Sequence, residues 1–170
     1  DEQAFRKQAG ASFITSAPAL PIDDLGDAGF KKTYRVHCAY YAGSMANGIA
    51  SVEMVVALGK SGLLASFGAA GLARPRLESA IQSIQTALPE GPYALNLIHS
   101  PSEQAVERNA VEVYLQQGVH VVEASAYIDL TPSIVYYRVA GLSQSGDDGI
   151  RISNHVIAKV SRREVATKFM

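Results

Sequence analysis

The chain has 170 residues, of which 48% are apolar and 18% charged, and its 15 basic and 16 acidic side chains leave a formal net charge of −1. This length predicts one domain with a core of ordinary size. The near-zero charge excludes a protein that is held on nucleic acid by a basic surface.

The cellular compartment is indicated by what the sequence lacks. Its single cysteine, Cys38, allows no internal disulfide and suits a reducing compartment. No run of about 18 uninterrupted apolar residues is present, so we expect no membrane span. Residues 1–7 are acidic and mixed, unlike the basic and then apolar start of a signal peptide. The sequence therefore predicts a cytoplasmic globular protein.

The first 34 residues are expected to form an irregular lead-in. Pro18 and Pro21 interrupt any helix, because proline lacks a backbone donor and restricts the residue before it. Residues 23–27 have the composition of a turn. We therefore divide the chain into a lead-in over 1–34 and a folded region over 35–170.

From Tyr34 onward, short apolar runs alternate with helical patterns. The predicted strands are 36–42, 63–67, 93–98, 119–125 and 156–160, and the predicted helices are 49–59, 74–88, 102–117 (with Ser102 as N-cap), 131–139 and 163–170. A polar turn over 143–149 and a short strand over 150–153 precede the last main strand. Strands that alternate with helices through short links predict crossover connections and a parallel sheet.

Two parallel architectures fit this alternation. One is an open doubly wound sheet of the flavodoxin type, and the other is part of an eight-stranded β/α barrel. Five strand–helix units are enough for the open sheet, whereas a closed barrel takes about 250 residues. Periodicity alone leaves both open.

In either architecture ligands bind at the carboxyl ends of the strands. Small residues follow the first strand from Gly43, Asn96 lies in the third strand, and Lys159 lies at the end of the fifth. Small residues let a flat ring approach the backbone, and the amide and the ammonium offer polar contacts to it. Simpler interpretations also hold: Met45 could cap the core, Asn96 could make structural bonds, and Lys159 could form a salt bridge with Glu123.

Histidines and glycines give weaker indications. His99 follows the third strand and could act as an acid or base, although a surface-loop histidine is the simpler interpretation. His120 and His155 are expected near strand starts, away from the ligand end. Gly68 and Gly71 are interpreted as tight-turn glycines.

Several segments together resemble one enzyme family. They are 41–51 (YAGSMANGIAS), 66–72 (SFGAAGL), 96–101 (NLIHSP), 122–126 (VEASA), 137–142 (YRVAGL) and 155–162 (HVIAKVSR). They resemble the flavin-dependent enoyl reductases of polyunsaturated fatty acid synthases and trans-acyltransferase polyketide synthases, within the wider nitronate monooxygenase superfamily. The resemblance runs in order from about residue 16 to residue 170.

The resemblance implies an α/β fold that is part of an eight-stranded (β/α)8 TIM barrel, about its first five units. It implies FMN at the carboxyl mouth, NAD(P)H as reductant, and an α,β-unsaturated thioester on acyl carrier protein as substrate. No catalytic residue and no metal site is assigned. The cofactor-binding residues that it implies are Gly43, Ser44, Met45, Asn96 and Lys159, with Asn47 and Ser125 as less specific matches.

The chain departs from this family in length. In such barrels the loops after the seventh and eighth strands hold the phosphate, and the superfamily's catalytic histidine lies beyond the fifth strand, so His99 does not correspond to it. We expect the rest of the barrel to come from another polypeptide or from outside this sequence, and a homo-oligomer is possible. The alternatives are a nitronate monooxygenase-type flavoenzyme and a non-catalytic half-barrel that docks within a synthase.

Overall fold

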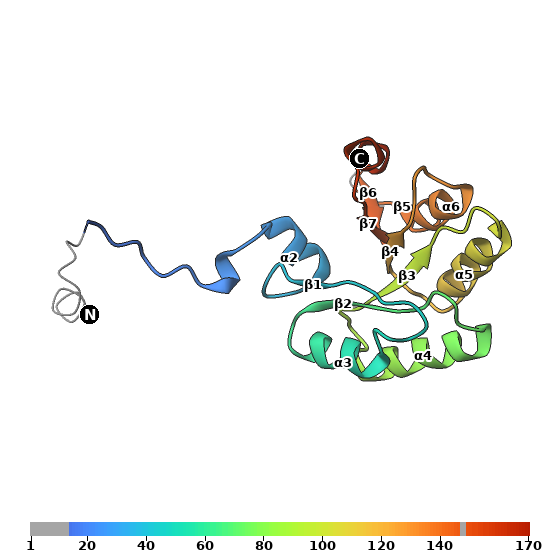
Figure 1. The fold of residues 1–170 in the computed structure, drawn as a ribbon, viewed down its shortest axis with the longest axis horizontal. Helices are drawn as coiled ribbons and strands as arrows, with labels where there is room; N and C mark the ends of the chain where they lie inside the picture. Colours follow the sequence, from blue (N-terminus) through green and yellow to red (C-terminus); the bar gives the residue numbers. More distant parts are fainter. Residues whose placement is uncertain (1–13, 147–148) are drawn as a thin grey trace.

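A computed structural model describes residues 14–146 and 149–170, and its main element is a five-stranded parallel sheet covered by helices (Figure 1). The strands of this sheet are β1 (Tyr41–Ala42), β2 (Leu64–Phe67), β3 (Ala94–Ile98), β4 (Val121–Ser125) and β7 (His155–Lys159). The helices are η1 (Ile22–Asp24), α2 (Ala28–Tyr34), α3 (Val52–Lys60), α4 (Arg74–Ala87), α5 (Gln104–Gln116), α6 (Pro132–Ala140) and α7 (Arg163–Phe169). None of the helices in the described residues has the length and apolar character needed to cross a bilayer.

The strand order decides between the two expected architectures. The order is β1-β2-β3-β4-β7, so each strand lies beside its predecessor in the sheet and all pairs are parallel. A doubly wound sheet instead reverses its order at a switch point. The partial barrel is therefore confirmed, and the open-sheet alternative is wrong.

One side chain shows how strongly the sheet curls. Glu123 of β4 accepts a hydrogen bond from the hydroxyl of Tyr41 in β1, although two strands lie between them. Neighbouring strands are ~4.8 Å apart, so a flat sheet would separate β1 from β4 by about 14 Å. The sheet must therefore be curled, with Glu123 on its concave face.

The two faces of the sheet have different partners, because successive strand residues point to opposite sides. The outer face supplies the main core beneath the helices, through Ala65, Phe67, Leu95, Leu97, Val122 and Ala124. The inner face carries a smaller apolar cluster of Val36, Leu64 and Ala94, against which Phe30 and Tyr34 of α2 pack. The inner face is thus covered near the amino ends of its strands and polar near their carboxyl ends.

The helix α2 corrects the expected irregular lead-in. Residues Ala28–Tyr34 are helical, and the side chain of Asp27 caps the helix by accepting a hydrogen bond from the backbone of Phe30. Seven residues are too few to show a helical period in the sequence, and packing on the inner face stabilises the helix instead. Residues 1–13 of the predicted lead-in lie outside the described part of the chain.

Three further expectations need correction. The first strand is only Tyr41–Ala42 rather than 36–42. Ser102 is not an N-cap, because α5 begins at Gln104 after Glu103 and has no side-chain cap. The expected short strand over 150–153 is confirmed as β6 (Ile150–Ile152), but the polar turn is shorter than expected, because β5 (Leu142–Gln144) pairs with β6 in an antiparallel hairpin. Residues 147 and 148 of the predicted turn are not among the described residues.

Candidate functional site

The Glu123 carboxylate is the centre of a polar cluster at the carboxyl ends of β1, β4 and β7. Its side chain is fully buried, with 0% exposure. One oxygen, Oε2, accepts from the Tyr41 hydroxyl at 2.5 Å and from the Ser44 backbone N at 3.0 Å. The other, Oε1, accepts from Ser44 Oγ at 2.5 Å, Ser125 Oγ at 3.0 Å and Lys159 Nζ at 2.5 Å. We call Tyr41, Ser44, Glu123, Ser125 and Lys159 the Glu123 cluster.

The alternation of strand residues explains how the cluster assembles. Glu123 and Ser125 are two residues apart in β4, so both point to the inner face. The parallel register places Lys159 of β7 beside Ser125, two residue pairs beyond Glu123. The salt bridge between Lys159 and Glu123, considered above as the simpler interpretation of Lys159, is confirmed.

Hydrogen bonding keeps the buried carboxyl ionised. Burial alone would raise the pKa of Glu123, but donation from Lys159, Ser44 and Tyr41 lowers it to about 2. The pKa of the Tyr41 phenol is raised by burial and by the hydrogen bond to Glu123, so Tyr41 stays a neutral donor. At neutral pH the cluster therefore has an ionised Glu123 carboxylate and a neutral Tyr41 phenol at its centre.

Asn96 joins this cluster from β3. Its side-chain Nδ2 donates to Ser125 Oγ at 2.7 Å and to the backbone O of Glu123 at 3.4 Å. The hydroxyl of Tyr114 in α5 donates to the backbone O of Asn96 at 2.6 Å. The structural-bond interpretation of Asn96 is therefore confirmed, and these bonds also place Asn96 beside the residues predicted to bind a cofactor.

The loop after β1 lies directly against the cluster. A Cβ atom added at Gly43 would be 3.4 Å from Glu123 Oε2, so the missing side chain leaves the carboxylate side of the mouth open. Met45 is 49% exposed, so the interpretation that it caps the core is wrong. The structure thus brings Gly43, Ser44, Asn96 and Lys159 together, with Met45 exposed in the same loop.

A second loop supports the first one. The backbone N of Asn47 donates to Ala70 O, and that of Gly48 donates to Gly68 O, both at 2.8 Å. Gly71, with φ +81°, fits the tight-turn interpretation. Gly68 does not, because it lacks a positive φ and an added Cβ would overlap the backbone carbonyl of Met45. The close contact between the two loops therefore leaves no room for a side chain at position 68.

His99 belongs to a different cluster. Its Nδ1 is 3.1 Å from Oε2 of buried Glu107, which also accepts from the Tyr127 hydroxyl at 2.9 Å and from Thr131 Oγ1. The His99 ring stacks on Tyr127, and its side chain is only 15% exposed. The surface-loop interpretation is wrong, and the contact with α5 places His99 in the helix layer rather than on the inner face.

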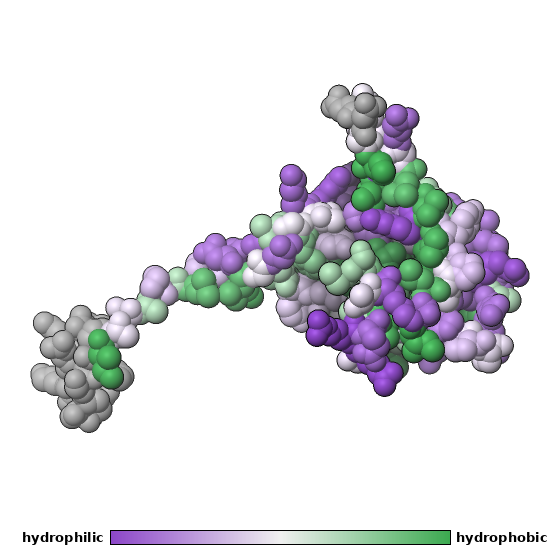
Figure 2. Space-filling view, turned by 90° about the horizontal axis from the view of Figure 1, so that it is seen from above, coloured by the Kyte–Doolittle hydropathy of each residue, from purple (hydrophilic) through white to green (hydrophobic). Residues whose placement is uncertain are grey.

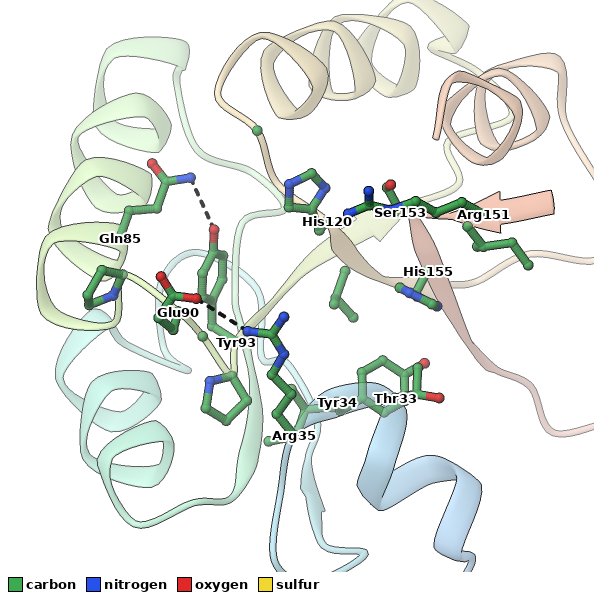
Figure 3. A pocket seen from close by; sticks show the side chains of 17 residues that line it. Thr33, Tyr34, Arg35, Gln85, Glu90, Tyr93, His120, Arg151, Ser153 and His155 are labelled. Atoms are coloured by element: carbon green, nitrogen blue, oxygen red, sulfur yellow. Dashed lines mark hydrogen bonds and ion pairs between the residues drawn. The ribbon is translucent and has the colours of Figure 1, made fainter. Parts of the chain in front are cut away.

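A cavity of about 710 Å³ lies at the opposite end of the sheet (Figure 3). Its lining includes Arg35, His120, Arg151 and His155, and Arg35 forms an ion pair with Glu90 at 3.3 Å. His155 begins β7 and His120 immediately precedes β4, which confirms their expected place near strand starts. Barrel enzymes place their chemistry at the carboxyl ends of strands, so we do not assign this cavity as the site.

Sequence reasoning missed two inner-face residues. Tyr41 and Ser66 lie in segments that carry the resemblance, but neither is among the expected site residues. Ser66 Oγ is buried and has no hydrogen-bond partner in the described part of the structure. Side chains two residues apart in a strand point to the same face. This alternation places Ser66 on the same face as Leu64, and Ser125 on the same face as Glu123, so it could have located both serines on the inner face.

Comparison with known proteins identifies what the chain resembles. It is 51% identical over 149 residues to a polyunsaturated fatty acid synthase protein of Thraustochytrium sp., a match that covers 88% of this chain and 10% of that protein. Polyketide biosynthesis protein ThaF of Burkholderia thailandensis is 43% identical over 155 residues, covering 91% of this chain and 13% of ThaF. No family model matches the sequence.

A solved structure agrees with the sequence relatives. The enoyl reductase domain of MlnA, from the macrolactin biosynthesis cluster of Bacillus amyloliquefaciens, matches with a TM-score of 0.83 and 40% identity. The resemblance to the synthase enoyl reductases is confirmed. The match covers 88% of this chain and 34% of the MlnA chain, so the sequence spans about a third of that domain and about a tenth of the Thraustochytrium synthase protein.

Proposed function

We propose that this chain is part of a flavin-dependent enoyl reductase of polyketide or polyunsaturated fatty acid biosynthesis. The enzyme would reduce an α,β-unsaturated thioester on acyl carrier protein, with NAD(P)H as the reductant and FMN as the cofactor, in the cytoplasm. The similarity to the MlnA enoyl reductase domain over nine tenths of the chain is the observation that carries this proposal. We propose a division into a lead-in over 1–34, which ends in helix α2 against the sheet, and a barrel part over 35–170.

The chemistry of the site fits a flat, electron-accepting ring. Gly43 presents no side chain, Met45 exposes apolar surface, and Lys159 has ammonium hydrogens beyond the one donated to Glu123. The residues that would hold FMN are Gly43, Ser44, Met45, Asn96 and Lys159, with Asn47 and Ser125 in supporting positions. Bound FMN would supply hydride transfer from NAD(P)H to the β-carbon of the substrate.

The residues of this chain have separate tasks in that scheme. Ser44 is held by two hydrogen bonds to Glu123, so the loop after β1 keeps one conformation beside the ring. Asn96 bonds to Ser125 and so fixes that hydroxyl against the carboxylate. Lys159 offers a charged donor at the edge of the mouth. His99, which is bonded to Glu107, is not proposed as a proton donor.

Flavin absorbance of the purified full-length protein tests the proposal. We expect a yellow protein whose flavin band bleaches with NAD(P)H and returns when an enoyl thioester such as crotonyl thioester is added. A colourless protein that gains nothing from added FMN would contradict the proposal. Turnover of an alkyl nitronate with oxygen would indicate a nitronate monooxygenase, and capture of carrier protein without flavin would indicate a docking module.

Lys159→Ala is expected to lower FMN occupancy by roughly tenfold or more, because a hydrogen bond from a charged group contributes about 1.5–3 kcal/mol. Lys60→Ala is the matched control, since Lys60 is exposed at the end of α3. Flavin content per protein after gel filtration measures both. Equal occupancy in the two variants would remove Lys159 from the proposed site.

A further inference from the structure

The two partners of the ion pair between Lys159 and Glu123 differ in their exposure to solvent. The carboxylate is fully buried, whereas half of the lysine side chain is exposed, and Oε1 and Nζ are 2.5 Å apart. The carboxylate is fixed by four further hydrogen bonds, from Tyr41, Ser125 and twice from Ser44. The position of the ammonium is therefore set by the carboxylate, at the carboxyl end of β7.

The pairing changes what Lys159 can bind. A free ammonium attracts a phosphate through its net charge, but here a carboxylate in direct contact offsets that charge. A phosphate placed on Lys159 would also lie close to the Glu123 carboxylate and be repelled by it. The ammonium hydrogens that remain suit a polar ring atom, for which direction matters more than net charge.

The same carboxylate controls the loop on the other side of the mouth. Glu123 accepts from both the backbone N and the hydroxyl of Ser44, and Gly43 leaves the space next to Oε2 open. A single buried group thus fixes a donor from β7 and a loop from β1. No other carboxylate in the described residues contacts either Ser44 or Lys159.

On these grounds, and resting on the proposed flavin-dependent function, we propose that Glu123 is the positioning residue of the flavin site. It directs Lys159 to the flavin ring rather than to the phosphate, and it holds the Ser44 loop beside that ring. The charge balance of the pair then sets how well the site accommodates the reduced ring, which carries more negative charge than the oxidised one.

Binding of FMN and of riboflavin, which lacks the phosphate, tests where Lys159 acts. Both flavins are titrated by fluorescence quenching into the full-length wild-type protein and its Lys159→Ala and Lys168→Ala variants. Lys168 is the control, because it forms an exposed ion pair with Asp129. Lys159→Ala should weaken both flavins by the same factor, roughly tenfold, and Lys168→Ala neither. Loss of FMN binding with unchanged riboflavin binding would overturn the proposal.

The reduction potential of the bound flavin tests the role of Glu123. Glu123→Gln removes the negative partner and should favour the reduced flavin about tenfold, equivalent to about 30 mV for a two-electron couple. Lys159→Ala removes the positive partner and should shift the potential in the opposite direction. Shifts of the same sign, or no shift, would overturn the proposal, since a merely structural role would not give opposite signs.

Two outcomes separate this inference from the function on which it rests. A wild-type protein that binds no flavin contradicts the proposed function itself. If Glu123→Gln fails to fold, the comparison of FMN with riboflavin in the Lys159→Ala variant still decides between ring and phosphate, because Lys159 is half exposed. The double variant Glu123→Gln/Lys159→Gln loses both charges, so the reduction potential of its flavin should return toward the wild-type value. A potential that stays shifted would contradict the proposal that the two charges offset each other.

Discussion

The absence of a side chain at Gly68 allows the loop after β1 to pack closely against the loop after β2. The backbone of Gly68 is bonded to Ala50 and Gly48, and the Met45 carbonyl occupies the place where a Cβ would lie. Because the obstructing atom belongs to the backbone, it does not move away as a flexible side chain would. The position of the Ser44 loop thus depends on a glycine in the next loop.

Gly68→Ala is therefore expected to destabilise the protein by about 1–3 kcal/mol or more, as overpacking does. Urea unfolding followed by circular dichroism measures the free energy of unfolding. Gly146→Ala is the control, because nothing lies within 4 Å of an added Cβ there, and a change within about 0.5 kcal/mol is expected. A Gly68→Ala protein as stable as this control would contradict the close approach.

The Glu123 carboxyl predicts a pH dependence of stability. Its pKa is lowered from 4.5 to about 2 on folding, so the ionised cluster stabilises the fold fully above the unfolded value. That contribution is lost as the pH falls through the folded value of about 2. The difference in unfolding free energy between wild type and Glu123→Gln should shrink over this range, and a constant difference would contradict the assignment.

The sequence supports the residue-scale prediction of the site only in part. Gly43, Ser44, Asn96 and Lys159 were expected together and do lie together, because carboxyl ends of parallel strands meet at one edge. The central role of Glu123 was not expected. A glutamate in a buried strand signals a polar partner, but its reach from β4 to β1 depends on the curl of the sheet, which no local pattern encodes.

Among the elements, α6 is connected to the buried Glu107 through its cap. The Thr131 hydroxyl accepts from the backbone N of Ile134 at 3.3 Å and donates to Glu107. Glu107 in turn contacts His99 and Tyr127, which follow β3 and β4. One threonine thus joins the start of α6 to the ends of two strands.

Thr131→Ala should lower the free energy of unfolding by roughly 1–2 kcal/mol, at the upper end of cap losses, because Glu107 also loses a donor. Ser51→Ala, which removes the cap of α3 alone, should cost about 1 kcal/mol. Thr131→Ser keeps the hydroxyl and should retain most of the stability in thermal melts. Equal losses for Thr131→Ser and Thr131→Ala would show that the hydroxyl is unimportant.

The bounds of strands were predicted best where a continuous run of apolar residues lies between two turns. The starts and ends of β2, β3 and β4 agree with the expected ranges to within two residues, because apolar strands end at glycine, proline or polar turns. The strand β6 agrees with the expected short strand over 150–153, but helix α2 and strand β5 were not expected. Both α2 and β5 are too short to show a period, and contacts with distant residues stabilise α2.

At the scale of the whole molecule, apolar side chains remain at the surface. Figure 2 shows a band of apolar surface across the body of the molecule. Exposed apolar residues occur on α6 and on the hairpin, including Val135, Val139, Leu142, Ile150 and Ile152. The edge strands β1 and β7 each have one neighbour within the described sheet, which leaves one side of each strand open.

The 170-residue chain on its own is therefore expected to self-associate as its concentration rises. Sedimentation velocity over a range of concentrations measures this. Ile150→Ser/Ile152→Ser, on the apolar face of the hairpin, should weaken the association, whereas Arg151→Ser on the other face should not. A monomer at every concentration would contradict the expectation.

The consecutive strand order also has a consequence for biosynthesis. Because each strand of the five-stranded sheet pairs with the previous strand of that sheet, its partner has always been synthesised before it. Each strand can pair with its neighbour as soon as it leaves the ribosome, so the sheet can form strand by strand from β1 to β7 during translation. The cluster around Glu123 is the exception, since Tyr41 and Ser44 gain their buried partner only after some eighty further residues have been added.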